Sequence, residues 1–418
     1  MPFTAPKGTF DILPADVRQW QWLEETFRHL CARYAFSEIR TPIFECTELF
    51  ARGVGEDTDI VSKQMYSFKT IGGDALTLRP EGTASTVRAV IEHSLLSAGG
   101  VLKLFYLGPI FRHEAPQKGR YRQFHQVGVE AFGSAGPEID AEILAFASEL
   151  LRTIGISDAV LELNSVGCPE CRPRYRDALR TALASARSEL CADCRRRYDT
   201  APLRILDCKV EHCRELSATA PVILDILCDA CKTHLHGVEE GLHALQVPYR
   251  LNPHIVRGLD YYTRTAFEFI AGNLGAQNTV LAGGRYDGLV EELGGPPTPA
   301  IGFAAGIERL LMSAGTAIPL PEQAGSLYLA TLGDAARRYG FVLANTLRQA
   351  GIPTMVDYLA RSLKAQMREA NRLNTRYALI LGEDELARNE ATLRNMQDSS
   401  QESIQLDGLV EKLQGLFE

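Results

Sequence analysis

The sequence lacks any window of about twenty uncharged apolar residues, which a membrane-spanning helix would need. Its N-terminal stretch has no basic segment followed by an apolar run. It carries an acid and three prolines instead, which argues against a signal peptide. It also lacks an excess of positive charge, since the formal net charge is -8, so a general nucleic-acid binder coated with cations is excluded. We expect a cytoplasmic globular protein, without a membrane partner, that contacts RNA through local basic patches.

The composition that remains is ordinary for a globular protein, with 45% hydrophobic and 23% charged residues among 418, enough for two or three separate cores. No internal repeat and no low-complexity segment is present. The ten cysteines are unevenly placed, because Cys31 and Cys46 are isolated and the other eight lie between Cys168 and Cys231. In a chain expected to be cytoplasmic, such clustering indicates metal ligands or reduced thiols before it indicates disulfides.

Hydrophobic patterns predict one core that is interrupted once. Apolar residues recur with helical spacing over 15–34, at Trp20, Leu23, Phe27 and Leu30, which predicts a core-facing helix. The runs that follow read as strands of an antiparallel sheet: 75–78, 102–107, 127–132 and, after the interruption, 266–270, before a predicted helix at 303–312. The interruption is rich in cysteine, arginine and helix formers, which predicts a helical inserted domain.

Beyond a linker rich in glycine and proline, strand and helix patterns alternate, which is typical of a small α/β domain. Its predicted strands are 326–331, 353–356 and 377–381, and its predicted helices are 335–350 and 362–373. The expected domains are therefore a catalytic α+β domain in two parts, 1–166 and 249–318, a Cys-rich helical insertion, 167–248, and a C-terminal α/β domain, 325–418.

Four cations lie near a glycine in the segment 111–126, where Glu114 is the one acid. They are Arg112, Lys118, Arg120 and Arg122. Guanidinium groups bind phosphate oxygens in a bidentate way, and glycine permits close backbone approach, so the segment suits a polyphosphate. Tyr121 and Phe124 could offer a stacking face to a purine. A solvated hairpin tip with aromatic core residues is the alternative.

Two further segments could form walls of a ligand site. Val256 to Tyr262 places an arginine and two tyrosines next to a glycine, suited to charge stabilisation and to hydrogen bonding of a small polar ligand. Leu78 to Thr83 ends in Glu81 and Thr83, which could recognise a cationic amine. The alternatives are a structural turn and an N-cap formed by Thr83. Glycine-rich turns at 282–288 and 302–309 match neither the P-loop nor the dinucleotide fingerprint, and helix capping or tight packing could explain them.

Taken together, the segments resemble the class II aminoacyl-tRNA synthetases, and within them the histidine family. Phe111-Arg112-His113-Glu114 is similar to the second motif of the class, 302–309 to its third, and the helix-plus-strand region ending at Pro42 to its first. The stretches RGLDYY, 257–262, and GGRYDG, 283–288, resemble the two histidine-specific motifs. The resemblance covers nearly the whole chain. It implies a homodimer, because the first motif forms the subunit interface in most of the class.

The resemblance also implies roles for individual residues. Arg112 would hold the α-phosphate of ATP and the substrate carboxylate, and Arg257 would take the place of a catalytic metal at the α-phosphate. Arg309 would stack on adenine opposite Phe124, with Arg120 and Arg122 on the triphosphate. The full ATP-binding set implied is Arg112, Glu114, Arg120, Arg122, Phe124 and Arg309.

For histidine, Glu81 and Thr83 would contact the α-amino group, and Gln126 would lie beside the carboxylate. Glu130, Tyr261 and Tyr262 would surround the imidazole, where a carboxylate can fix the tautomer. With Arg112 and Arg257, these residues complete the histidine site that the resemblance implies. The reaction would be adenylation of histidine by ATP, aided by Mg²⁺ on the outer phosphates, followed by transfer to tRNA. No protein general base is evident, so positioning and electrostatics would carry catalysis.

The C-terminal domain would read the anticodon by the same resemblance. Four cations repeat there at intervals of three or four on a predicted helix: Arg361, Lys364, Arg368 and Arg372. Like charges at this spacing repel one another unless an anion or nearby carboxylates compensate. The stripe could therefore contact RNA phosphates or be a solvated face.

Three Cys-x-x-Cys pairs lie in the insertion: Cys168 with Cys171, Cys191 with Cys194, and Cys228 with Cys231. The gap between the first two pairs fits a four-cysteine structural Zn²⁺ site, and Cys208, His212 and Cys213 could add ligands. Many members of the family lack these pairs, so the resemblance does not imply zinc. Reduced thiols inside helices are the alternative, and the combination of pairs is not readable from spacing.

Two other functions are compatible with part of the pattern. A catalytically silent synthetase paralogue could act as a histidine-sensing regulatory subunit, but such paralogues typically lose the RGLDYY-type arginine and the C-terminal domain, and this sequence has both. An amide-forming ligase with the same adenylate chemistry would need no anticodon domain.

Overall fold

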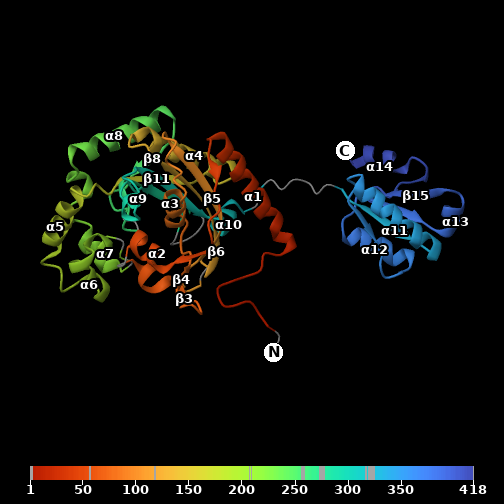
Figure 1. The fold of residues 1–418 in the computed structure, drawn as a ribbon, viewed down its shortest axis with the longest axis horizontal. Coiled ribbons are helices and arrows are strands. Elements are labelled where there is room, and N and C mark those ends of the chain that lie inside the picture. Colours follow the sequence, from red (N-terminus) through yellow and green to blue (C-terminus); the bar gives the residue numbers. More distant parts are fainter. Residues whose placement is uncertain are drawn as a thin grey trace. The chain divides into compact units, whose positions relative to one another are not determined.

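The computed structural model describes residues 3–417, except 56–57, 117–118, 207, 209, 256–258, 273–277, 316–317 and 319–324. The chain divides into two compact units, Met1–Leu320 and Pro321–Glu418, drawn as ribbons in Figure 1. Within the described residues, no helix combines the length and the apolar character needed to cross a membrane.

The first unit is built on an eight-stranded sheet in the order β1-β5-β6-β11-β10-β9-β7-β8. The central strands, from β5 to β7 in this order, pair antiparallel. The edge strands β1 and β8 pair parallel with their neighbours. The bounds are β1 (Ser37–Glu38), β5 (Leu102–Phe111), β6 (Gln123–Phe132), β7 (Val160–Ser165), β8 (Tyr249–Leu251), β9 (Thr263–Ile270), β10 (Thr279–Arg285) and β11 (Ala300–Gly306). The predicted antiparallel sheet is confirmed.

Helices α1 (Pro14–Arg33), α4 (Pro137–Thr153) and α10 (Ile307–Ala314) share one core with this sheet. The predicted apolar stripe of α1 is buried as expected. Along β6, Val127 and Val129 belong to this core. Because side chains alternate between the two faces of a strand, the intervening residues of β6 point away from these helices, toward the opposite face of the sheet.

A separate three-stranded sheet, in the order β2-β4-β3, contains β2 (Phe44–Cys46), β3 (Tyr66–Lys69) and β4 (Ala75–Leu78). The prediction that 75–78 joins the main sheet was wrong, because alternation identifies a strand without naming its partner. Helices α2 (Thr47–Val54), α3 (Thr83–Glu92) and α9 (Leu289–Glu292) and the π-helix η1 (Ile60–Gln64) complete this region.

The cysteine-rich segment is helical between β7 and β8. Its helices are α5 (Cys171–Leu183), α6 (Ala192–Thr200), η2 (Pro202–Ile205), α7 (Glu211–Ser217), η3 (Ile223–Asp225) and α8 (Asp229–Ala244). Figure 1 shows α5, α6 and α7 gathered to one side of the sheet, while α8 runs along α4. Gly241 of α8 faces Ala141 of α4 so closely that an added Cβ would lie 2.6 Å from the alanine methyl. A glycine is therefore needed at this crossing.

The second unit has a five-stranded sheet in the order β13-β12-β14-β15-β16. Its bounds are β12 (Leu327–Thr331), α11 (Asp334–Gln349), β13 (Thr354–Val356), α12 (Leu363–Arg372), β14 (Tyr377–Leu381), α13 (Glu383–Ala387), β15 (Glu390–Asn395), β16 (Gln401–Gln405) and α14 (Leu409–Phe417). The first three strands are parallel and alternate with helices, as predicted. The antiparallel pair β15 and β16 was not predicted.

One predicted boundary was wrong within the first unit. The helix expected at 303–312 begins at Ile307, and Phe303 lies in β11. This strand is paired on both sides, with β6 and β10, so its residues form a short, nearly continuous apolar run. Such a run cannot be told from a buried helix by its period.

Candidate active site

A cavity of about 330 Å³ opens on the face of the sheet opposite α1 and α4. Its wall contains most of the residues predicted to bind histidine or ATP: Glu81, Thr83, Arg112, Glu114, Arg120, Phe124, Gln126, Glu130, Tyr261, Tyr262 and Arg309. Arg122 is not in the wall, and its Nε donates to the carbonyl of Glu114 at 3.4 Å. Arg257 lies outside the described residues. Segments distant in sequence thus meet at one site.

Glu81 occupies the entry to α3. Its carboxylate accepts the backbone N–H groups of Thr83, at 2.7 Å, and Ala84, at 2.8 Å, and so satisfies two donors that the first turn of a helix leaves unpaired. The N-cap hypothesis for Thr83 was wrong, because Thr83 is the first residue of α3 and Glu81 serves its first turn. The Thr83 hydroxyl instead donates to Oε1 of Glu130 at 2.7 Å.

Glu130 lies near the C-terminal end of β6 and is 1% exposed. Its second carboxyl oxygen, Oε2, accepts from the hydroxyl of Tyr286. Burial raises the pKa of Glu130 to about 8, against the hydrogen bonds from Tyr286 and Thr83, which lower it. On the neighbouring strand, a Cβ at Gly302 would lie 1.9 Å from Oε2. Glycine at this position therefore makes room for the carboxyl group.

Arg112 lies directly after β5, and two contacts fix one side of its guanidinium group. Its Nε donates to the carbonyl of Pro80 at 2.8 Å, and its guanidinium carbon lies 5.5 Å from the ring centroid of Phe124. The two terminal nitrogens have no acceptor among the described residues, and the side chain lines the cavity. Burial lowers the pKa of Arg112, but a guanidinium stays charged in proteins. The cavity thus contains a fixed cation that can bind an anion with two parallel hydrogen bonds.

Further cations lie along the same wall. Arg120 pairs with Glu114 at 2.9 Å. Burial, and then the charge of Arg120, lower the pKa of Arg309. Bringing positive groups so close together in a partly desolvated wall is unfavourable unless an anion joins them. Glu114 offsets part of this repulsion, so the wall here contains two close arginines and one carboxylate.

The tyrosine wall contains residues that sequence reasoning assigned and others that it missed. Tyr261 and Tyr262 are buried with ring centroids 4.8 Å apart, and Tyr286 lies 5.6 Å from Tyr261. Tyr286 was missed as a ligand-site residue although it lies within GGRYDG, the recognised motif. The other missed polar residues of the wall are Tyr106, Glu268, Thr279 and Glu308, whereas Tyr121, expected as a stacking residue, does lie in the wall. Tyr106 gave no separate signal, because a tyrosine in an apolar strand reads as core.

Two further polar residues of the cavity wall, Gln126 and Glu308, differ in what they contact. Gln126 has a buried Oε1 without a hydrogen-bond partner among the described residues, so it can accept a donor from a ligand. The carboxylate of Glu308 accepts the backbone N–H of His125 at 3.0 and 3.1 Å and contacts the imidazole Nδ1 at 3.1 Å. It anchors α10, which carries Arg309, to β6.

The residue before Tyr286 faces away from the cavity. Arg285 is fully buried, and its Nε donates to both oxygens of Asp140 on α4, at 3.1 and 3.2 Å. Asp140 also accepts from Thr265 at 2.5 Å and contacts Nε2 of His234 at 2.8 Å. Arg264 approaches Nδ1 of that histidine at 3.4 Å. Since arginine can only donate, Nδ1 accepts and Nε2 carries the proton. This network joins the sheet, α4 and α8 behind the site.

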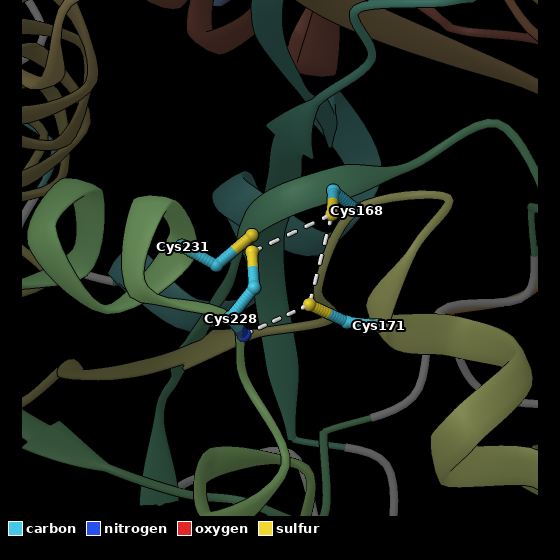
Figure 2. Close-up of side chains that lie close together, drawn as sticks. All are labelled: Cys168, Cys171, Cys228 and Cys231. Atoms are coloured by element: carbon cyan, nitrogen blue, oxygen red, sulfur yellow. Dashed lines mark hydrogen bonds between the residues drawn. The ribbon is translucent and has the colours of Figure 1, made fainter.

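The eight clustered cysteines form two groups of four, and within each group all sulfurs lie within 4.8 Å of one another. The first group is Cys168, Cys171, Cys228 and Cys231, drawn in Figure 2. The second is Cys191, Cys194, Cys208 and Cys213. The first two Cys-x-x-Cys pairs therefore do not share a site, although the gap between them would fit one. The combination that spacing left open is the first pair with the third. His212 belongs to neither group.

In the second unit, the cationic stripe is only partly neutralised. Arg361 pairs with Asp357 at 2.5 Å, and Arg372 pairs with Glu369 at 2.5 Å. Lys364 and Arg368 are exposed and have no carboxylate partner within the described residues. These two cations are therefore available to an external anion.

The chain resembles known proteins over its full length. A family model described as histidyl-tRNA synthetase matches residues 8–310, and one described as an anticodon binding domain matches 326–416. A histidine–tRNA ligase of Desulforamulus reducens is 52% identical, covering 97% of this chain and 98% of the relative. One of Trichlorobacter lovleyi is 51% identical, covering 97% of each.

Solved structures agree with this relationship. The crystal structure of apo histidyl-tRNA synthetase from S. aureus superposes with a TM-score of 0.84 and 41% identity, over 99% of this chain and 100% of that one. The resemblance to the class II synthetases predicted from the motifs is confirmed. By sequence, by fold and by the convergence of its motifs on one cavity, the chain belongs to the histidyl-tRNA synthetase family.

Proposed function

We propose that the cavity binds L-histidine and ATP, and that the enzyme forms histidyl-adenylate, releases pyrophosphate and transfers histidine to the 3′ end of its cognate tRNA. The observation that carries this proposal is the convergence, on one cavity, of Arg112 and Arg309 with Phe124 and the buried carboxyls of Glu81 and Glu130. Cations and an aromatic ring suit a nucleotide, and buried polar groups suit a small zwitterion with a polar side chain.

In the first step, the histidine carboxylate attacks the α-phosphate of ATP. The terminal nitrogens of Arg112 bind the carboxylate and the phosphate together, which orients the attacking oxygen and offsets the charge that develops on phosphorus. Arg257 supplies a second cation at the same phosphate. Arg309 and Phe124 hold the adenine, and Arg120 binds the outer phosphates, with Glu114 as its partner in the ligand-free wall. Arg122, which lies outside the wall, acts indirectly through the Glu114 carbonyl.

Histidine is selected by buried polar groups of the cavity wall. Glu81 and Thr83 bind the α-amino group, and Gln126 lies beside the carboxylate. Glu130 accepts from one imidazole nitrogen, while Tyr261, Tyr262 and Tyr286 form the surrounding wall. An apolar amino acid of similar size would leave this buried carboxyl group without its ligand donor, so it would be rejected strongly.

Mg²⁺ would offset the charge of the outer phosphates, and Glu114 and Glu268 are the carboxylates of the wall that would hold it or its waters. The cysteine groups of the insertion would add structural zinc. We place the reaction in the cytoplasm, where tRNA is charged.

The C-terminal unit reads the anticodon in this proposal. Lys364 and Arg368, on α12, are the cations of the stripe that would contact RNA phosphates. Replacing both by alanine should lower kcat/KM for tRNA and leave histidine-dependent pyrophosphate exchange unchanged. Arg372→Ala is the matched control on the same helix, because Arg372 is already paired with Glu369. Equal effects of the two changes would contradict the assignment.

The enzyme acts as a homodimer in this proposal. In the small sheet, Phe44 of β2 pairs with Leu78 of β4, and Phe68 of β3 pairs with Leu76 of β4. Phe44 and Phe68 are 48% and 44% exposed. Residues paired across strands share a face, so the small sheet presents an apolar face to solvent, as a self-association surface does. Phe44→Asp with Phe68→Asp should yield a monomer in light scattering. A dimer of unchanged stability would contradict this surface.

Pyrophosphate exchange into ATP with each amino acid in turn tests the central proposal. Histidine alone should support exchange, and Arg257→Ala should abolish it in folded protein. Arg112→Lys keeps the charge but loses the planar fork, so exchange should fall by about 100-fold, equivalent to about 2.7 kcal/mol. Arg52→Lys, at an exposed ion pair with Glu48, is the control. Exchange with another amino acid, or full activity of Arg112→Lys, would overturn the proposal.

The regulatory paralogue is disfavoured by the comparisons. Identity to histidine–tRNA ligases extends over nearly the whole chain, and the anticodon-binding model matches the C-terminal unit. An amide-forming ligase would not need an anticodon-binding unit.

A further inference from the structure

We propose that the insertion holds two zinc ions, one in each four-cysteine group, and that the two ions stabilise different parts of the protein. We call Cys168, Cys171, Cys228 and Cys231 the clasp, and Cys191, Cys194, Cys208 and Cys213 the outer site. The two groups share no cysteine, and each alone supplies the four thiolates of a closed structural zinc site.

The sulfur separations fit a metal better than a disulfide. Four sulfurs bonded to zinc at about 2.3 Å in a tetrahedron lie about 3.8 Å from one another. In the clasp, Cys168 Sγ lies 3.6 Å from Cys171 Sγ and 3.8 Å from Cys228 Sγ. In the outer site, Cys191 Sγ lies 3.9 Å from Cys208 Sγ. A disulfide would need about 2.05 Å. Figure 2 shows the clasp sulfurs turned toward a common point.

Backbone geometry favours thiolates at both groups. Cys171, Cys194, Cys213 and Cys231 each lie in the first turn of a helix, where N–H groups and the helix dipole favour negative charge. The N–H of Cys228 donates to Cys171 Sγ at 3.1 Å, and that of Cys191 donates to Cys213 Sγ at 3.2 Å. Such bonds orient metal-bound sulfur from the second shell of ligands.

The clasp joins the two ends of the insertion to the catalytic sheet. Cys171 and Cys228 are 57 positions apart in sequence, and Cys171 and Cys231 belong to the main core. Just before the clasp, Gly167 O accepts from Arg264 N at 2.8 Å. Arg264 has a left-handed φ of 51°, which is unfavourable for arginine and must be held by its surroundings.

The same end of α5 also reaches the segment that carries the cavity tyrosines. Arg172, which follows Cys171, donates to the carbonyl of Asp260 at 2.9 Å. Asp260 and Arg264 flank Tyr261 and Tyr262 in sequence. The clasp therefore stabilises this segment from behind, as a positioning element rather than a catalytic one.

Zinc at the outer site would stabilise a different part of the protein, namely α6 and α7. Among the described residues, its core contains three aliphatic side chains, Leu183, Leu190 and Ile205, besides buried cysteines. So small an apolar core provides little folding free energy, and natural domains of this kind are commonly stabilised by a metal. Binding of zinc would supply that free energy to α6 and α7 directly.

Metal analysis of the full-length protein, purified with reductant and without chelator, tests the proposal without substrates, so its result is independent of histidine activation. Two zinc ions per chain are expected, with four sulfurs per zinc at about 2.3 Å in X-ray absorption. Cys171→Ser with Cys231→Ser, and Cys194→Ser with Cys213→Ser, should each leave one zinc. Cys46→Ser, at an exposed cysteine outside both groups, should leave two.

The outer-site variant should retain histidine-dependent exchange, whereas the clasp variant should raise KM for histidine. Wild-type protein with one zinc or none, or with iron in its place, would overturn the proposal. A clasp variant that is folded, lacks one zinc and keeps the wild-type KM would overturn the positioning role.

Discussion

Replacing Glu130 by glutamine tests whether this buried carboxyl group of the cavity wall is protonated when no ligand is bound. The folded pKa is about 8, against about 4.3 in an unfolded chain. Because the folded value is raised, the stability that protonated Glu130 contributes is complete below about pH 4 and is lost as pH rises through 8. Between pH 6 and 8 the wild type should lose about 2–3 kcal/mol from this group. Glutamine does not titrate.

The Glu130→Gln substitution also lowers the free energy of unfolding directly. Both oxygens of Glu130 accept from hydroxyls, of Thr83 and Tyr286, and glutamine offers one oxygen in place of two. Losing one buried hydrogen bond costs about 1–3 kcal/mol. At pH 6 the variant should therefore be less stable than wild type by this amount, and by pH 8 the deficit should vanish or reverse.

Urea unfolding of the ligand-free protein at half-unit steps of pH measures the difference. Thr83→Val is the matched control: it removes a hydrogen bond to the same carboxyl group but keeps the titrating proton, so its deficit should not shrink with pH. A Glu130→Gln deficit that stays constant from pH 6 to 8.5 would refute a raised pKa at this position.

Three further predictions concern the scaffold and the second unit. Gly302→Ala should abolish histidine-dependent exchange, because its Cβ would lie 1.9 Å from Glu130 Oε2, whereas Gly288→Ala, with open space around it, should be neutral; activity in both would contradict the fit. Asp140→Asn removes the fully buried counterion of Arg285 and leaves it only the more exposed Asp287, at a cost of up to about 3–5 kcal/mol. The melting temperature should therefore fall further than with Asp287→Asn, and equal falls would count against the network. A chain ending at residue 320 keeps one compact unit and should retain exchange while tRNA charging falls more than tenfold; loss of exchange in folded protein would show that the cavity depends on the second unit.

Local patterns predicted the elements well where one physical signal dominates. The stripe of α1 and the apolar runs of β5 and β6 follow from periodicity and burial. The strand β11 was read as the start of a helix, because a strand buried on both faces has no alternation to reveal it. Which strands pair with one another was harder to predict from the sequence. The strand 75–78 was assigned to the wrong sheet, since pairing depends on the path of the whole chain.

The residues of the site likewise divide into those that a local pattern predicts and those that only the fold brings together. Arg112, Glu130 and Arg309 were found through motifs, and the structure brings them to one cavity. Tyr106 was missed because a buried tyrosine in a strand looks the same in sequence whether it meets a ligand or the core. The combination of cysteine pairs stayed open because Cys-x-x-Cys spacing defines half of a metal site, and the fold decides which halves meet.

The strands that bracket the helical insertion are neighbours in the sheet: β7 and β8 pair parallel, with Leu161 opposite Tyr249. Because the two strands run parallel, the chain leaves β7 at Ser165 and re-enters the sheet at Tyr249, beside Leu161, so the connection must run back about 13 Å along the strands. A replacement for the insertion would therefore need a crossover of about a dozen residues or more. It would also have to keep the contact of Arg172 with the carbonyl of Asp260, because that contact lies behind the cavity tyrosines.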